Sequence, residues 1–257
     1  LSNYQKAHKI YEAQKNDPPN LARNLNNIGI VYKHLGKYEL AVQALEKSLA
    51  LKQAQFGEIH PENAFSYDNL GDVYLSQNNY SEALKFYQLA ICQHFSDYCA
   101  DDILTNPVFE QHTLTGQPRQ LLTVLASKAK TLCLHPDSRN QPAYLETAIQ
   151  CYKLCDQLIS TIRRQQETTT SKLFLLEEVL PIYEAAIQTS FDLYELNPAP
   201  ELAESALQFM EKSKSVLLLT TIREDKARFF AKIPDSLLQR ESNFKADINY
   251  LERKRAQ

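Results

Sequence analysis

Several features that would point to particular classes of protein are rare or absent in this sequence. The chain has 257 residues but only five glycines, one methionine and no tryptophan. No apolar run approaches the roughly 18 residues that a membrane-spanning helix needs. The first residues also lack the basic and apolar segments of a signal peptide. We therefore expect no membrane partner.

The charges are mixed, with no surplus of basic residues. Lysine and arginine number 28 against 31 acidic residues, so the formal net charge is −3. A nucleic-acid-binding surface would need a basic patch or stripe, so no nucleic-acid partner is expected. The sequence also lacks a glycine-rich phosphate loop, a Gly-x-Ser-x-Gly motif and a His-Glu-x-x-His motif. We expect no catalytic residue, no metal and no cofactor within these residues.

The cysteines form no ligand pattern. Their number is odd, at five, and only two of them lie close in sequence, four residues apart on one predicted helix face: Cys92, Cys99, Cys133, Cys151 and Cys155. We interpret them as small buried apolar residues rather than metal ligands. Such usage is typical of a reducing compartment, and we expect a cytoplasmic location.

A repeat is the most informative feature that is present. Scarce glycine, with abundant leucine, alanine, glutamate, lysine and glutamine, favours helix almost throughout. Five positions return 42 residues later: Leu25, Ile28, Gly29, Tyr32 and Ala41 correspond to Tyr67, Leu70, Gly71, Tyr74 and Ala83. A fixed period of this kind predicts stacked helical hairpins, each burying its apolar face against the next.

Small residues and turn residues fit this architecture. Gly29 has no side chain, so we expect the partner helix to approach its backbone closely. Gly36 is suited to a helix end, and Pro61 to the first turn of the next helix.

Together these residues resemble the tetratricopeptide repeat, whose usual period is about 34 residues. The additional residues lie in 52–63, which lengthen the second helix and add a Gly-Glu-Ile-His-Pro linker, as in the kinesin-light-chain type of repeat. The resemblance implies an all-α, right-handed superhelix of tetratricopeptide-like hairpins, degenerate toward the C-terminus. It also implies a non-catalytic scaffold that binds a protein or an extended peptide in its concave groove.

We divide the chain into four segments. Residues 1–95 contain a partial repeat and two full repeats, and 96–120 form an irregular insertion that is either functional or a brace. Residues 121–214 hold degenerate hairpins, in which Pro181 predicts a kink or a local break. Residues 215–257 are C-terminal helices, the last beginning near Ile233, that lead into an absent downstream domain. The chain begins within a repeat, so we expect a fragment of a longer protein.

The second half has a more specific resemblance. An ordered series runs through the segments 171–174, 181–187, 209–215, 233–238 and 248–252. It resembles the region before the peptidase domain of bacterial CHAT proteins, which are caspase-like and associated with tetratricopeptide repeats. The resemblance implies that the repeats sense a partner and regulate their own downstream cysteine peptidase domain. It also makes a defence effector complex a possible partner.

Two alternatives to this reading stay open. The first is a free-standing adaptor that joins two proteins without an attached enzyme. The second is an enzyme within these residues, which would need a convergent polar cluster that the sequence does not show.

The first helix of each repeat supplies the candidate groove residues. They are Arg23, Asn26, Asn27, Ile30, Lys33 and His34 in one repeat, and Phe65, Asp68, Asn69, Asp72 and Ser76 in the next. Asn27 and Asn69 occupy the same register. Their amides are suited to binding an extended peptide backbone, because each offers donors and an acceptor. The alternative is that these asparagines brace neighbouring helices.

The charges of these helices allow two interpretations. Arg23, Lys33 and His34 form a modest positive patch that could hold an acidic peptide or a terminal carboxylate. Asp68 and Asp72 in the second repeat argue against a repeated lysine–asparagine clamp, and favour a solvated surface of mixed charge.

Overall fold

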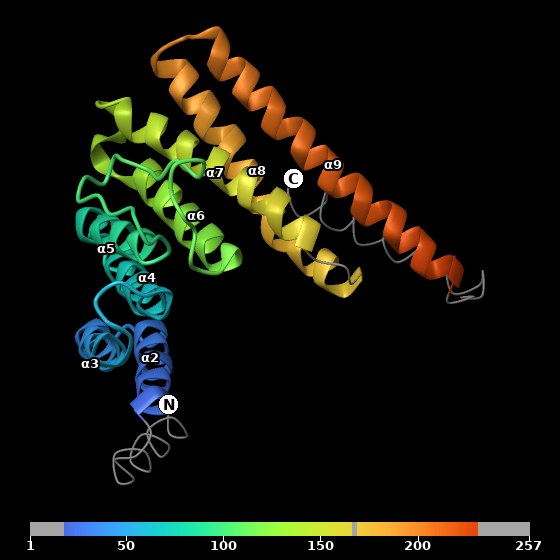
Figure 1. Cartoon of the computed structure of the whole chain (residues 1–257). Helices are drawn as coiled ribbons and strands as arrows, with labels where there is room; N and C mark the ends of the chain where they lie inside the picture. The colour runs from blue at the N-terminus through green and yellow to red at the C-terminus, as the bar shows by residue number, and fades with distance from the viewer. Residues whose placement is uncertain (1–17, 166–168, 231–257) are drawn as a thin grey trace. The chain divides into compact units, whose positions relative to one another are not determined.

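The computed structural model describes residues 18–165 and 169–230 and confirms the all-α prediction. Three hairpins follow one another along the chain (Figure 1), and their helices are α2 (Pro18–His34) with α3 (Tyr38–Phe56), α4 (Pro61–Ser76) with α5 (Tyr80–Cys92), and α6 (Pro118–Leu134) with α7 (Ala143–Gln165). The right-handed superhelix stays a prediction.

Each hairpin packs mainly on its neighbours in the sequence. The second helix of one hairpin contacts the first helix of the next, from α3 to α4, α5 to α6 and α7 to α8 (Thr169–Leu196). The first helices α2, α4, α6 and α8 also contact one another in order. Among the described residues the second helices α3, α5 and α7 show no comparable contacts. The first helices therefore form a closely packed row, and this row holds the candidate groove residues.

The two repeat glycines mark the closest approach within a hairpin. A Cβ atom on Gly29 would lie 2.6 Å from Leu45 Cγ, and one on Gly71 would lie 2.7 Å from Tyr87 Cε1. Both distances are far below ordinary contact. The expected close approach at Gly29 is confirmed, and the equivalent glycine in the next repeat has the same function.

The extended linker between the first two hairpins is held by side chains. Gly57 ends α3 with φ of 92°, a left-handed conformation that glycine adopts without strain. His60 caps α4, because its Nδ1 accepts a hydrogen bond from the Glu62 amide at 3.2 Å. The buried Asn63 donates through Nδ2 to the Gly57 carbonyl at 2.9 Å. The longer period thus adds an ordered linker.

No helix forms between α5 and α6 in the predicted insertion, and α6 begins at Pro118, three residues before the predicted position. Phe95 and Leu114 form an isolated antiparallel bridge across the base of the insertion. The Phe95 ring is buried and packs near Tyr98 and Phe109, with centroids 5.6 and 6.1 Å away. The insertion therefore has an aromatic centre of its own.

Helix α8 does not break at Pro181, which lies inside a continuous α-helix. Proline removes one backbone hydrogen bond. Buried side chains on both sides of it, Val179 and Tyr183, hold the helix against its neighbours. Tertiary packing therefore overrides the preference for a local break, and the predicted kink stays a prediction. The turn between α6 and α7 contains a short 3₁₀ helix, η1 (Pro136–Arg139).

The chain divides into two compact units, residues 1–211 and 212–257. Helix α9 (Pro200–Phe230) begins in the first unit and provides the described part of the second. The partial repeat before Pro18 and the helix expected from Ile233 lie outside the described residues. In the part that is described, no helix has the length and apolarity to cross a membrane. That part also holds no group of three or more His, Cys, Asp or Glu residues placed to bind a metal.

Candidate peptide-binding surface

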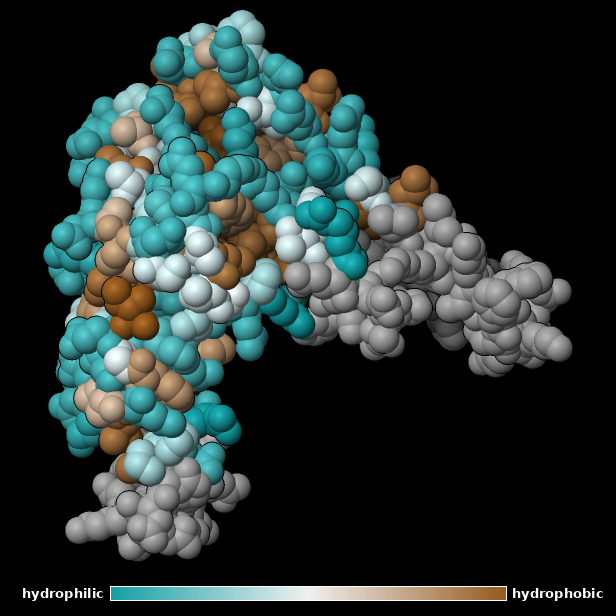
Figure 2. All heavy atoms as spheres, in the orientation of Figure 1, coloured by the Kyte–Doolittle hydropathy of each residue, from teal (hydrophilic) through white to brown (hydrophobic). Residues whose placement is uncertain are grey.

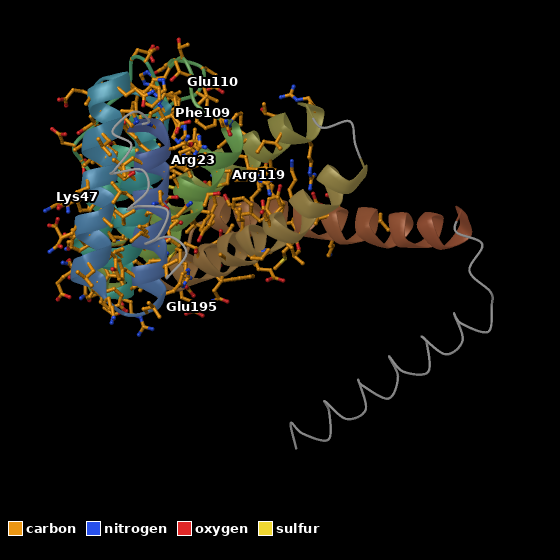
Figure 3. The ribbon with its side chains drawn as sticks, turned by 90° about the horizontal axis from the view of Figure 1, so that it is seen from below. Arg23, Lys47, Phe109, Glu110, Arg119 and Glu195 are labelled. Atoms are coloured by element: carbon orange, nitrogen blue, oxygen red, sulfur yellow. The ribbon has the colours of Figure 1, made fainter. Side chains whose placement is uncertain are left out.

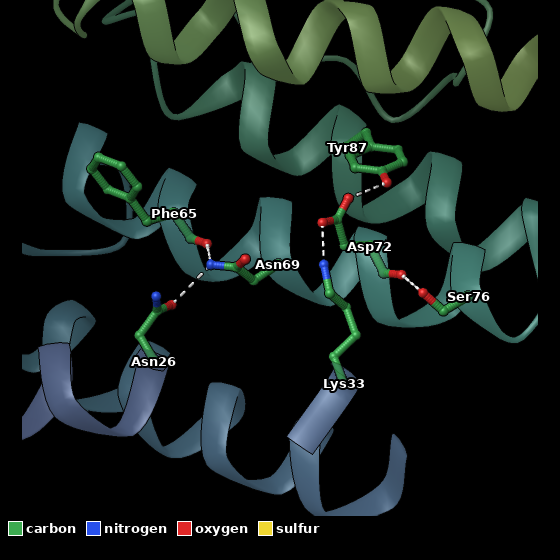
Figure 4. A network of polar contacts seen from close by, with 7 residues as sticks. All are labelled: Asn26, Lys33, Phe65, Asn69, Asp72, Ser76 and Tyr87. Atoms are coloured by element: carbon green, nitrogen blue, oxygen red, sulfur yellow. Dashed lines mark hydrogen bonds and ion pairs between the residues drawn. The ribbon is translucent and has the colours of Figure 1, made fainter. Parts of the chain in front are cut away.

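An asparagine contact joins the first helices of two successive repeats. The Asn69 amide donates to Asn26 Oδ1 at 3.2 Å and to the Phe65 carbonyl at 2.7 Å (Figure 4). Asn26 is almost fully buried, whereas Asn69 is half-buried. This geometry is that of a brace between α2 and α4. At Asn69 the structure therefore supports the alternative in which the asparagine braces neighbouring helices, because its side-chain amide donates both hydrogen bonds to acceptors within the protein.

Further along the same two helices, Lys33 of α2 and Asp72 of α4 form an ion pair, which Tyr87 of α5 joins through a hydrogen bond. The Lys33 ammonium pairs with Asp72 Oδ2, and the other carboxylate oxygen, Oδ1, accepts a hydrogen bond from the Tyr87 hydroxyl at 2.8 Å (Figure 4). Burial and the adjacent Asp72 charge raise the pKa of the Tyr87 hydroxyl above its usual value. Lys33 is therefore neutralised within the protein and contributes little to a positive patch.

Asp68 lies one turn before Asp72 in an unfavourable position for a charge. Its Oδ1 atom is buried and has no hydrogen-bond partner among the described residues. Burial, reinforced by the Asp72 charge and opposed by Lys33, raises the pKa of Asp68 to about 7. The carboxyl group is thus partly protonated near neutral pH.

Four of the candidate residues line one cavity. The cavity has a volume of about 430 Å³ and lies between the start of α2, the end of α3 and the start of α4. Arg23, Asn26 and Asn27 face it from α2, and Phe65 faces it from α4. Arg23 and Phe65 are exposed, Asn27 is half-buried, and the Asn27 side chain makes no hydrogen bond within the described ranges. These groups are available to a ligand.

The structure adds Lys52 to this cavity, a residue that the groove prediction missed. Lys52 is only 6% exposed and lines the cavity from α3, with its ammonium 5.6 Å from the centre of the Phe65 ring. A signal was available in the sequence. Lys52 follows Ala41, Leu45 and Ser48 at helical spacing, so a charged residue falls on the buried face of its helix.

The remaining candidates lie apart from the cavity. Ile30 is half-buried along α2, and His34 is exposed as the last residue of that helix. Ser76 donates to the Asp72 carbonyl within α4 at 2.8 Å. The structure therefore places four of the eleven candidates at the cavity, where Asn26 also accepts a hydrogen bond from Asn69. Four more gather at Asp72, namely Lys33, Asp68, Ser76 and Asp72 itself, and Ile30 and His34 belong to neither group.

A second, apolar pocket lies further along the row of first helices. It has a volume of about 410 Å³ between α6 and α8 and is lined by Leu122, Ala126, Tyr152, Pro181, Ile182 and Ala185 among others. Glu178 also lines it, and its carboxylate forms an ion pair with the Arg119 guanidinium at 2.7 Å. On the face shown in Figure 2 the surface is mainly hydrophilic, with hydrophobic residues in small separate groups. Exposed apolar surface on that face is therefore limited.

The cysteines in α7 lie in the protein interior. Cys151 and Cys155 are fully buried, and burial raises the pKa of the Cys151 thiol to about 11. The thiolate is the reactive form of cysteine, so neither thiol has the environment of a nucleophile. The interpretation as small buried residues is confirmed for Cys92, Cys151 and Cys155. It is wrong for Cys99, which is exposed in the irregular segment after α5, and Cys133 is only half-buried.

The part of the chain that contains the first two hairpins is similar in sequence to known proteins. A tetratricopeptide-repeat family model matches residues 1–54 and again 20–91. An RxLR effector protein, SFI4, of Phytophthora infestans is 33% identical over 67 residues, and the secreted RxLR effector protein RXLR-C07 of Plasmopara halstedii is 31% identical over 67 residues. These matches cover 26% of this chain, which spans only about a fifth of either relative, 20% and 21%.

Crystal structures of kinesin-light-chain TPR-like repeats from Podosopora anserina are also similar to this chain. One of them is aligned over 80% of this chain and 98% of the other, at 14% identity and a TM-score of 0.38. A second has the same identity and TM-score over 79% and 97%. The match to the tetratricopeptide-repeat family thus extends from the first residue to residue 91 and leaves the rest of the chain without a family match of this kind.

Proposed function

We propose that this chain is a non-catalytic scaffold that binds a protein or an extended peptide along its row of first helices. One observation carries the proposal: two successive first helices place Arg23, Asn27 and Phe65 around a single cavity. The exposed guanidinium, the amide, which has no hydrogen-bond partner among the described residues, and the aromatic ring are suited to a peptide's charge, backbone and side chain.

The cysteines support both a non-enzymatic role and a reducing environment. Each of the five thiols is free, and Cys99 is exposed. An exposed free thiol persists most readily where thiols are kept reduced, so we place the protein in the cytoplasm.

The finer proposal is that the chain regulates a caspase-like CHAT protease. Its support is the ordered series of segments between residues 171 and 252. Two members of that series pack together, since the Tyr183 and Phe209 rings lie 6.3 Å apart. The Tyr183 hydroxyl donates to Asp156 on α7 at 2.6 Å. The alternative is an adaptor without an attached enzyme.

Site-directed photocrosslinking tests the scaffold. A photoreactive amino acid at Asn27 in the cavity is compared with one at Lys47, which points from α3 away from α2 (Figure 3). We expect a defined crosslinked protein in the native organism from position 27 and none from position 47. Equal products from both positions, or none from either, would contradict the proposed binding surface.

Reading the gene past the codon for Gln257 tests the finer proposal. A following α/β domain with separated histidine and cysteine residues in caspase-like contexts would support the protease. Further repeats or a stop codon would leave the adaptor.

A further inference from the structure

Two cysteines lie where the insertion leaves α5. Cys92 is the last residue of that helix and is only 1% exposed, whereas Cys99 lies in the irregular segment that follows and is exposed to solvent. Both thiols are free in this structure. The proposed scaffold function uses neither of them, so a buried thiol and an exposed thiol at one junction need a separate explanation.

The chain turns back on α5 between these two cysteines. The Gln88 side-chain amide, one helical turn before Cys92, donates to the Tyr98 hydroxyl at 3.2 Å. The Ala100 carbonyl lies 4.0 Å from Cys92 Sγ, within reach of a weak hydrogen bond from the thiol. The residues on either side of Cys99 are therefore held against the end of α5.

The two thiols themselves are in contact. Burial, together with a side-chain hydrogen bond to Cys99, raises the pKa of the Cys92 thiol to about 12. Burial also raises the pKa of the Tyr67 hydroxyl on α4, and both Cys99 and Cys92 add to that shift, so the two sulfurs share one neighbour. A disulfide needs Cβ atoms about 4 Å apart. Since Cys99 lies in irregular backbone, it can make the remaining approach without moving a helix.

We propose that Cys92 and Cys99 form a reversible disulfide under oxidation, which locks the beginning of the insertion onto the end of α5. Cys99 reaches the oxidant first, because Cys92 has almost no accessible surface. Disulfides of reducing compartments are typically transient and sensitive to redox state. A bond of this kind therefore fits a chain whose thiols are otherwise free.

Hydrogen peroxide is a sufficient oxidant for this step. The Cys99 thiolate attacks one peroxide oxygen, so that an S–O bond forms, the O–O bond breaks, and hydroxide leaves as water with the thiol proton. The Cys92 sulfur then attacks the Cys99 sulfur, the S–S bond forms, and the S–O bond breaks. The departing hydroxide takes the Cys92 proton and leaves as a second water. Two thiols have lost two electrons and one peroxide has been reduced to water, and a dithiol restores both thiols by exchange.

The other three cysteines contact different groups. Cys133 Sγ lies 3.3 Å from Thr189 Oγ1, and the Cys151 thiol donates to Asn106 Oδ1 at 3.2 Å. Cys155 is fully buried in α7. These thiols therefore serve as internal controls for the reaction of the pair at the insertion.

Peptide mapping of the whole chain tests the bond. The protein is treated with hydrogen peroxide, remaining thiols are alkylated after denaturation, and chymotrypsin separates the two cysteines by cleaving after Phe95 and Tyr98. We expect two linked peptides that carry Cys92 and Cys99, and that dithiothreitol releases. Unreacted thiols, a dimer joined through Cys99, or Cys99 oxidised to sulfinic acid beside an alkylated Cys92 would each overturn the inference.

Two serine variants show whether the pairing is specific. Cys99 is exposed, so Cys99→Ser should fold normally, remove the linked peptides and leave Cys92 as a free thiol. Cys133→Ser, at a half-buried cysteine outside the pair, should retain the linked peptides. Circular dichroism shows that each variant folds. If Cys92 were found in a disulfide in Cys99→Ser, its pairing with Cys99 would be refuted.

The locking effect has its own measurement. Oxidation closes a short loop, so we expect the thermal midpoint of the wild-type chain to rise by about 5 °C. Hydrogen exchange in residues 93–105 should slow at the same time. Cys99→Ser, treated with peroxide in the same way, should show neither change. Equal protection in Cys99→Ser, or a linked wild type without added protection, would contradict the lock.

Discussion

Lys128 Nζ donates a hydrogen bond to the Thr105 carbonyl at 2.7 Å, joining the interior of α6 to the insertion after α5. Lys128 is fully buried and also donates to Gln88 Oε1 at 2.7 Å and Asn106 Oδ1 at 2.9 Å. All three acceptors are uncharged. The insertion therefore has the bracing role that its sequence left open, and one ammonium group supplies much of that connection.

Lys128→Met should loosen the insertion. The three acceptors lose their donor, and a buried unsatisfied polar group costs about 1–3 kcal/mol. Removal of a buried cation offsets part of this cost, so we expect a net loss of about 2 kcal/mol in urea denaturation. Hydrogen exchange should rise in residues 96–117. Lys130→Met, on the exposed side of the same helix, is the control, and an equal loss there would contradict the role of Lys128.

Asp68 should make stability decrease as pH rises. Its pKa is about 7 in the folded protein against a usual 3.8, so the folded state binds more protons than the unfolded state between these values. Unfolding free energy therefore falls from about pH 4 to pH 7, by up to about 4 kcal/mol at about 1.4 kcal/mol per unit. Asp68→Asn should flatten this part of the profile and stabilise the protein at pH 8. Asp101→Asn, at an exposed position, serves as control, and a matching change there would remove Asp68 as the cause.

Gly71→Ala should destabilise the second hairpin. Alanine is the better helix former by about 1 kcal/mol, but its Cβ would lie 2.7 Å from the buried Tyr87 ring. Tyr87 is anchored to Asp72 and cannot move away cheaply. We expect a net loss of about 1–2 kcal/mol by thermal or urea denaturation. The loss should shrink when Gly71→Ala is introduced into Tyr87→Leu, and strict additivity would refute the steric cause.

Asn27 and Asn69 occupy the same register of successive repeats, but their replacement by alanine should have different effects. Asn69→Ala removes the bonds to Asn26 and to the Phe65 carbonyl, and should cost about 1 kcal/mol of stability. Asn27→Ala should leave the thermal midpoint near wild type and weaken partner capture. Loss of folding in Asn27→Ala would instead indicate that both asparagines brace neighbouring helices.

Some features of this protein follow directly from its sequence. The return of Gly29 as Gly71, with apolar residues at helical spacing around each, determines paired helices in close contact, because only glycine allows that approach. Gly57 likewise determines where α3 ends, and Pro61 determines where α4 begins. Lys52 and Lys128 both interrupt an apolar helix face, so their unusual burial was visible as a pattern.

Tertiary structure alone decided what these residues contact. Lys33 pairs with a carboxylate 39 residues away, and Lys128 with an insertion of irregular backbone that has no periodicity to read. Asn69 braces a neighbour while Asn27, in the same register, faces a cavity. Register determines the face of a helix, but the partner across that face depends on how adjacent hairpins pack. The same packing holds α8 together through Pro181, where the local preference alone favoured a break.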